Sequence, residues 1–131
     1  MARLDLTFPS ELPQVRAVAE EVKAFLSRQQ VPKRIIQECE LALVEACNNA
    51  VVHRISRNSP EVNVEVVCSE TLVEVRVLDF NTPIPWPEEF KLPPIDAETG
   101  RGLFMIHSLV NELSYERKEG RNCLRFMKRL V

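Results

Sequence analysis

The chain has 131 residues, which is enough for one domain with a hydrophobic core and too few for two. Hydrophobic residues make up 45% of it and charged residues 27%, as in an ordinary soluble globular protein. The formal net charge of -2 argues against direct nucleic-acid binding, which normally requires a basic excess.

The first elements predicted are a strand and two helices. Apolar and polar residues alternate over residues 4–8, which predicts a short strand ending at Pro9. Ser10 is the expected N-cap of a helix whose apolar positions recur at 3.6-residue spacing over residues 15–26. A second helix is predicted over residues 32–50, and its single apolar stripe indicates that it packs against another layer.

A hairpin and a long irregular segment come next. Residues 56–60 break the second helix, and valines then alternate with polar residues over 62–66 and 73–77. The short connection at 69–71 makes these two strands an antiparallel hairpin. Residues 81–99 hold five prolines, and loops of this length in compact domains are often lids or binding loops.

The last elements are a third helix and two strands. Gly100-Arg101-Gly102 opens the helix, and the strands flank a turn at residues 119–122. The order β-α-α-β-β-loop-α-β-β predicts an α+β fold with two layers, a mixed but mostly antiparallel sheet and helices on one face.

Six basic side chains crowd the last fifteen residues. The favoured interpretation is a solvated strand face, and the alternative is an anion-binding patch. The six are Arg117, Lys118, Arg121, Arg125, Lys128 and Arg129.

The cysteines and the absence of long apolar runs bear on where the protein works. The four cysteines are scattered without a Cys-x-x-Cys pair, which disfavours a zinc site, and each is expected to be a small core residue. They are Cys39, Cys47, Cys68 and Cys123. No apolar run has the length of a membrane span, and the first residues do not resemble a signal peptide. We therefore expect a reduced, cytoplasmic protein that does not contact a membrane.

One acid and one amide on the second helix are candidates for chemistry. Glu45 and Asn49 are one helical turn apart at the edge of the apolar stripe, in line with Glu38 and His53. A carboxylate in such a position can act as a general base, and an amide oxygen suits Mg²⁺. Considered alone, the pair is more often a solvated acid and amide on a helix edge.

Two further motifs have the chemistry of a nucleotide site. Asp79 ends a strand of valines, where its carboxylate can accept a hydrogen bond from an exocyclic amine such as that of adenine. Its alternative role is to initiate a turn. Gly100 and Gly102 precede a helix, so the backbone can approach a ligand closely and the free N–H groups can bind anions. Arg101 lies between them, within reach of a phosphate.

The order of these motifs resembles the GHKL ATPase superfamily. Over essentially its whole length, the chain looks most like the bacterial anti-sigma-factor serine/threonine kinases, on residues 44–53, 102–106 and 124–128. This resemblance implies that residues 1–131 form a single histidine-kinase-like ATPase domain with the GHKL (Bergerat) fold.

The resemblance also implies roles for individual residues. Glu45 would polarise the attacking hydroxyl, and Asn49 would coordinate Mg²⁺. Asp79 would bind the adenine amine. The remaining nucleotide-binding positions would be Asn81, Thr99, Gly100, Arg101, Gly102 and Leu103.

The function implied is that of a kinase in a partner-switching system. Such a protein uses ATP and Mg²⁺ to phosphorylate a serine of an anti-anti-sigma partner, and thereby regulates a sigma factor that it also binds. The resemblance further implies a homodimer. His53 and His107 are read as helix-edge or core residues, so a detached histidine-kinase catalytic domain is the less favoured alternative.

The loop after Asp79 departs from the superfamily pattern. The usual Asp-x-Gly-x-Gly is here Asp79-Phe80-Asn81-Thr82-Pro83, so both glycines are replaced. Asn81 is the mildest substitute because asparagine tolerates positive φ better than other non-glycine residues. The departure leaves open a second hypothesis, a regulatory module that acts by contact with a partner and does not phosphorylate it.

Overall fold

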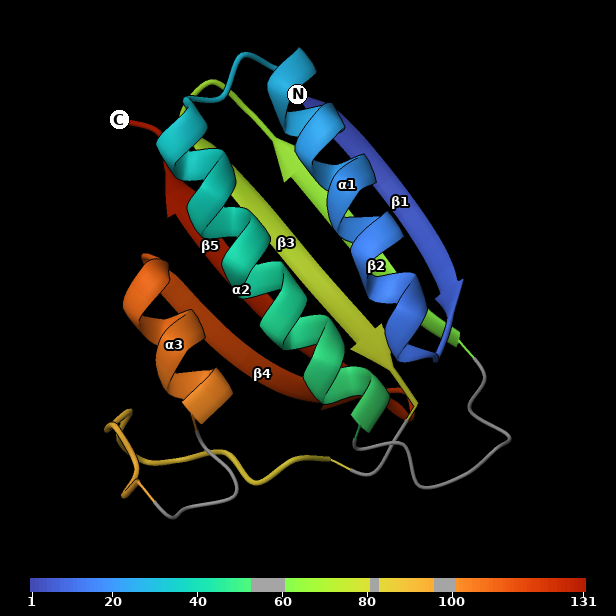
Figure 1. The fold of residues 1–131 in the computed structure, drawn as a ribbon, viewed down its shortest axis with the longest axis vertical. Helices are drawn as coiled ribbons and strands as arrows, with labels where there is room; N and C mark the ends of the chain where they lie inside the picture. The colour runs from blue at the N-terminus through green and yellow to red at the C-terminus, as the bar shows by residue number, and fades with distance from the viewer. Residues whose placement is uncertain (53–60, 81–82, 96–100) are drawn as a thin grey trace.

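Eight helices and strands make up the part of the chain that the computed structural model describes, residues 1–52, 61–80, 83–95 and 101–131 (Figure 1). They are β1 (Ala2–Pro9), α1 (Leu12–Arg28), α2 (Lys33–Val52), β2 (Glu61–Cys68), β3 (Leu72–Asp79), α3 (Arg101–Leu109), β4 (Glu112–Lys118) and β5 (Arg121–Arg129). This order confirms the one predicted from the sequence.

The five strands form one sheet in the order β1-β2-β3-β5-β4. All four pairings in it are antiparallel, so the expectation of a mixed sheet was wrong in this detail. The reason is the connections: β2–β3 and β4–β5 are hairpins, and the two helices between β1 and β2 bring the chain back in the opposite direction.

All three helices cover the same face of the sheet, which gives the two layers that the sequence predicts (Figure 1). The helix-facing side is lined by fully buried valines of the central strands and by Phe126. The helices bury their apolar stripes against it, because removing this surface from water is the main term that stabilises the fold. No helix in the described ranges has the length and apolar character that a membrane crossing needs.

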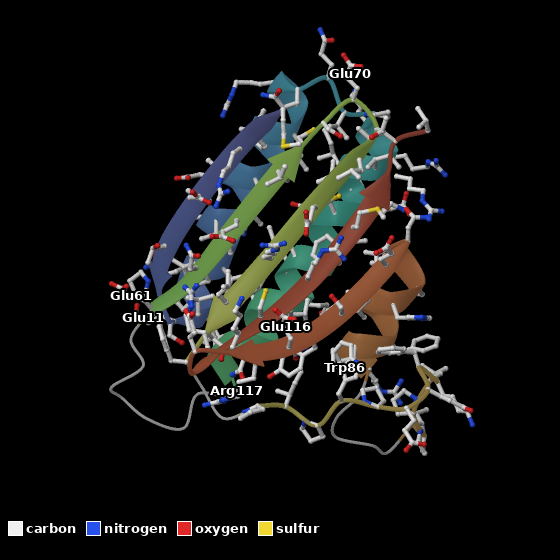
Figure 2. All side chains as sticks on the ribbon, turned by 180° about the vertical axis from the view of Figure 1, so that it is seen from behind. Glu11, Glu61, Glu70, Trp86, Glu116 and Arg117 are labelled. Atoms are coloured by element: carbon white, nitrogen blue, oxygen red, sulfur yellow. The ribbon has the colours of Figure 1, made fainter. Side chains whose placement is uncertain are left out.

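The opposite face of the sheet carries charged side chains (Figure 2). Arg125 pairs with Glu74 and lies 3.4 Å from Glu112, and Arg76 lies 3.1 Å from Glu74. Arg125 therefore belongs to a solvated strand face, as interpreted from the sequence. The same interpretation was wrong for Lys128, which is 8% exposed. Strand side chains alternate, so Lys128 shares the helix-facing side with Phe126.

The start of α1 differs from the prediction by one residue. Glu11, not Ser10, is the N-cap, and its side chain makes no capping hydrogen bond. The Glu11 N–H donates to the carbonyl of Pro9 at 2.7 Å, and this tight turn delays the helix until Leu12. Ser10 is left buried at the junction of strand and helix.

Three of the cysteines are core residues as expected, and the fourth is not. Cys39, Cys47 and Cys68 are buried, but Cys123 is only partly buried and lines a shallow cleft of about 300 Å³ on the charged face with Arg76. Cys123 alternates with the inward residues of β5, so its side chain faces away from the helices.

We predict that thiol reagents distinguish Cys123 from the buried cysteines. Burial raises the pKa of all four thiols, to about 12 for Cys39 and Cys47, so the difference in rate should come from the greater exposure of Cys123. One thiol per chain should react rapidly in the native protein, and all four after unfolding in denaturant. In the Cys123→Ser variant the rapid phase should vanish; its persistence would contradict this placement.

Candidate active site

Glu45 and Asn49 of α2 lie directly against the first turn of α3. A Cβ atom added to Gly102 would be 2.8 Å from Glu45 Oε2 and 3.5 Å from Asn49 Nδ2. Real Cβ contacts are essentially never that short, so a side chain at position 102 would require the Glu45 carboxylate to move. The fold thus brings together two of the motifs that the sequence singled out, although more than fifty residues separate them.

The first turn of α3 is held in place by its apolar side. Leu103 and Ile106 are buried in the core between α3 and the sheet. Because the side chain of Leu103 is part of this core, its predicted contribution to a ligand can come only from its backbone. The N–H groups of a first helical turn have no partner within the helix, and they attract anions.

Arg101 is an exposed residue that contacts the proline-rich segment. Its guanidinium donates a hydrogen bond of 2.8 Å to the carbonyl oxygen of Pro94. In this conformation the side chain is used by the protein itself, so it would have to exchange that carbonyl for a phosphate.

Asp79 is oriented by a residue that the sequence reasoning missed. Asn122 faces it across the β3–β5 pairing, and its Nδ2 donates to Asp79 Oδ1 at 2.8 Å. Arg117 in turn donates to Asn122 Oδ1 at 3.1 Å. Asn122 is only 1% exposed, and a buried amide needs such partners. The signal was a polar residue at the first inward position of a strand whose next two inward residues, Leu124 and Phe126, are apolar.

Residues 83–95 form a segment that packs against α3 and β4. Trp86 stacks on Tyr115 with ring centroids 5.2 Å apart, and Phe90 stacks on His107 at 4.3 Å. The Ile84 N–H donates to Tyr115 Oη at 3.0 Å. Burial raises the pKa of Tyr115 and the nearby Asp79 carboxylate raises it further, while the Ile84 N–H opposes the rise. Through the stack with Trp86 and the bond from Ile84, Tyr115 links this segment to β4.

These parts converge on one end of the molecule. The last turn of α2, the end of β3 and the start of α3 lie together at the lower end of Figure 1, and residues 83–95 pass beside them. Figure 2 shows Trp86 at the same end, beside α3. Three predicted site positions lie outside the described residues: Asn81, Thr99 and Gly100. So does His53, which was predicted to lie on the edge of the second helix.

The donors present fit a magnesium ion that is held mainly by a nucleotide. Across the described ranges, no group of three or more His, Cys, Asp and Glu side chains could form a complete metal site by itself. Mg²⁺ commonly takes only one or two protein oxygens together with phosphates and waters. The Asn49 amide oxygen, next to the Glu45 carboxylate and the first turn of α3, is suited to that role.

Sequence comparison gives one clear match. The family model described as histidine kinase-like ATPase domain matches residues 8–128, nearly the whole chain. No curated protein matches the sequence.

Solved structures with the same fold include three of low sequence identity. The RsbU and RsbW domains of Rv1364c from Mycobacterium tuberculosis align with a TM-score of 0.74 and 19% identity, over 99% of this chain but 33% of that one. This chain therefore spans about a third of that relative. The SiaB–SiaC complex from Pseudomonas aeruginosa aligns with a TM-score of 0.60 and 12% identity, over 96% of this chain and 89% of that one.

The third is the nucleotide-free catalytic domain of the histidine kinase ThkA, with a TM-score of 0.53 and 16% identity over 97% of both chains. The fold expected from the resemblance is thus confirmed.

We predict that Asn122 contributes to stability through its bonds to Asp79 and Arg117. Asn122→Ala should lower the free energy of unfolding by about 1–3 kcal/mol, because it removes two part-buried hydrogen bonds to charged partners. Denaturant titration measures the change. The control is Asn63→Ala, which removes a part-buried amide that donates to the carbonyl oxygen of Leu6. It should lower the free energy of unfolding by less than Asn122→Ala does. An equal loss in both variants would contradict a special role for Asn122.

We also predict that Tyr115 holds the proline-rich segment in place. Trp86 is the only tryptophan, so its fluorescence reports on this packing. In Tyr115→Leu, which lacks both the ring and the hydroxyl, the emission should move to longer wavelength as Trp86 becomes more exposed. Tyr115→Phe keeps the stacking and should shift it less. Emission unchanged in both variants would show that the stack does not hold the segment.

Proposed function

Since the chain belongs to the histidine kinase-like ATPase domain family, we propose that it binds ATP where α2 meets α3 and phosphorylates a partner protein. The observation that carries this proposal is the close approach of Gly102 to Glu45 and Asn49. It puts a candidate base, a candidate metal ligand and a helix start with free N–H groups side by side.

Asp79 would select the base of the nucleotide. Its Oδ1 accepts a hydrogen bond from Asn122, and a carboxylate has further lone pairs that can accept an N–H of the adenine amine. Asn81, in the loop that follows, would complete this side of the site. Because Asn122 fixes the orientation of the carboxylate, little rotamer entropy remains to be lost when the nucleotide binds.

The phosphates would lie at the first turn of α3. Thr99, Gly100 and Gly102 would let the backbone approach them, and the N–H of Leu103 would add a donor. Arg101 would leave the Pro94 carbonyl for a phosphate, which offers it a charge-assisted and stronger hydrogen bond.

Glu45 would be the general base, and Asn49 would hold the magnesium ion. The ion supplies neutralisation of the phosphate charge when it is bound. Glu45 would take the proton from the partner's hydroxyl as that oxygen bonds to the γ-phosphorus and the bond to the ADP oxygen breaks. The rest of the rate enhancement would come from positioning, as in other phosphoryl-transfer enzymes.

We propose that the partner is a small anti-anti-sigma protein phosphorylated on a serine, and that a sigma factor is the second partner. The support is the motif resemblance of residues 44–53 and 102–106 and the family membership of the whole domain. The proposal includes a homodimer acting in the cytoplasm, where sigma factors act.

A second candidate is a regulator that binds its partner without transferring phosphate. Two observations favour it: Arg101 is bonded to Pro94, and Asn81 stands where the superfamily has glycine. In this case nucleotide binding would be weak or absent, and contact with the partner alone would control the sigma factor.

The test combines calorimetry with a phosphotransfer assay. We expect the native protein to bind ATP with Mg²⁺, and Glu45→Gln to keep that affinity while losing about a hundredfold or more of the transfer rate. Glu21→Gln, on the exposed side of α1, is the matched control and should leave both unchanged.

The possible results separate the two candidates. No ATP binding at millimolar concentration would refute the kinase proposal. Binding without transfer to any anti-anti-sigma protein of the same organism would favour the non-catalytic regulator. Equal transfer by Glu45→Gln would show that another group is the base.

A further inference from the structure

A buried ammonium group joins three elements on the helix-facing side of the sheet. The side chain of Lys128 in β5 is 11% exposed, and its Nζ donates to Glu38 Oε2 at 3.0 Å and to the carbonyl of Leu109 at 2.8 Å. Burying a charge costs free energy unless it is paired and hydrogen-bonded, and these two acceptors meet that requirement.

The two acceptors belong to the two helices that form the candidate site. Glu38 is on α2, seven residues and thus about 10 Å before Glu45 along the same helix edge. Leu109 is the last residue of α3, the helix that begins with Arg101 and Gly102. One cation therefore sets the spacing between α2 and α3 at the end opposite to the site.

The contact with α3 also has the favourable polarity. The last carbonyls of a helix have no N–H partner within it, and they carry the negative end of the helix dipole. A lysine at that end satisfies one carbonyl and complements the dipole. The other anchors of α3 on the core include Leu103 and Ile106, whose apolar contacts fix the helix less directionally.

Among the residues that the structure describes, no other cation bridges Glu38 and the end of α3. Arg34 lies 3.9 Å from Glu38, but its side chain is 83% exposed and is on α2 itself, so it does not connect the two helices. The Cys39 thiol beside Lys128 is neutral at physiological pH because burial raises its pKa to about 12. It adds no charge that could compete with Glu38.

We infer that Lys128 is a positioning residue: it holds α2 and α3 at the separation that places Gly102 against Glu45 and Asn49. The consequence for ATP rests on the proposed function, whereas the effect on the helices does not. The close fit at Gly102 makes the site sensitive to this separation, since even a Cβ added there would come within 2.8 Å of Glu45 Oε2.

The test compares Lys128→Met with the native chain by hydrogen exchange and by ATP titration. Methionine has a similar volume but lacks the cation. Amides of residues 103–109 should exchange about tenfold faster or more, while those of β2 and β3 keep their protection. The dissociation constant for ATP with Mg²⁺ should rise about fivefold or more.

Lys23→Met is the matched control. It removes another lysine that pairs with α2, through Glu40 at 3.2 Å, but this pair connects α2 to α1. Its effects on exchange in α3 and on ATP affinity should stay below about twofold, as expected of a surface pair. Glu38→Gln keeps an acceptor for Lys128 and should give effects between those of the two methionine variants.

Unchanged exchange in α3 of Lys128→Met, or an equal change in Lys23→Met, would overturn the inference. If Lys128→Met does not fold, Glu38→Ala decides, because it removes the acceptor on α2: faster exchange confined to α3 supports the role of Lys128, and unchanged exchange refutes it. If the native chain binds no ATP, the proposed function fails, while the exchange result still decides whether Lys128 holds the helices.

Discussion

The close approach of α3 to α2 is the constraint on which the rest of the structure depends. A Cβ at position 102 would lie 2.8 Å from Glu45 Oε2, so a side chain there would displace the Glu45 carboxylate from its place against α3. The other features serve this contact. Leu103 and Ile106 bind α3 to the core, Lys128 joins its far end to α2, and the sheet beneath supports both helices.

The helix-facing side of the sheet serves both stability and function. The helix-facing side holds the core, and the few polar residues buried there are the informative ones, because each must be matched by a partner. Asn122 and Lys128 are such residues, and both are bonded to parts of the candidate site or to its helices. The charged outer side makes surface ion pairs, which individually contribute little to stability.

Much of this could be predicted from local patterns. The alternating valines of residues 62–66 and 73–77 and the apolar stripe of the second helix predict the strands, helices and layers, since periodicity determines which face is buried. The spacing of Glu45 and Asn49 predicts that they share a helix edge. Asn122 and Lys128 could not be found this way, because their roles depend on pairings across forty or more residues.

The stacking of Phe90 on His107 stabilises the contact between the proline-rich segment and α3. His107 and Arg101 are both on α3, so the segment is attached to the helix whose start would contact a phosphate. Suppose that a ligand binds only when the segment has left α3. Its apparent affinity is then its intrinsic affinity multiplied by the fraction of molecules in which the segment has left. A partner protein that holds the segment away would then raise nucleotide affinity without touching the nucleotide.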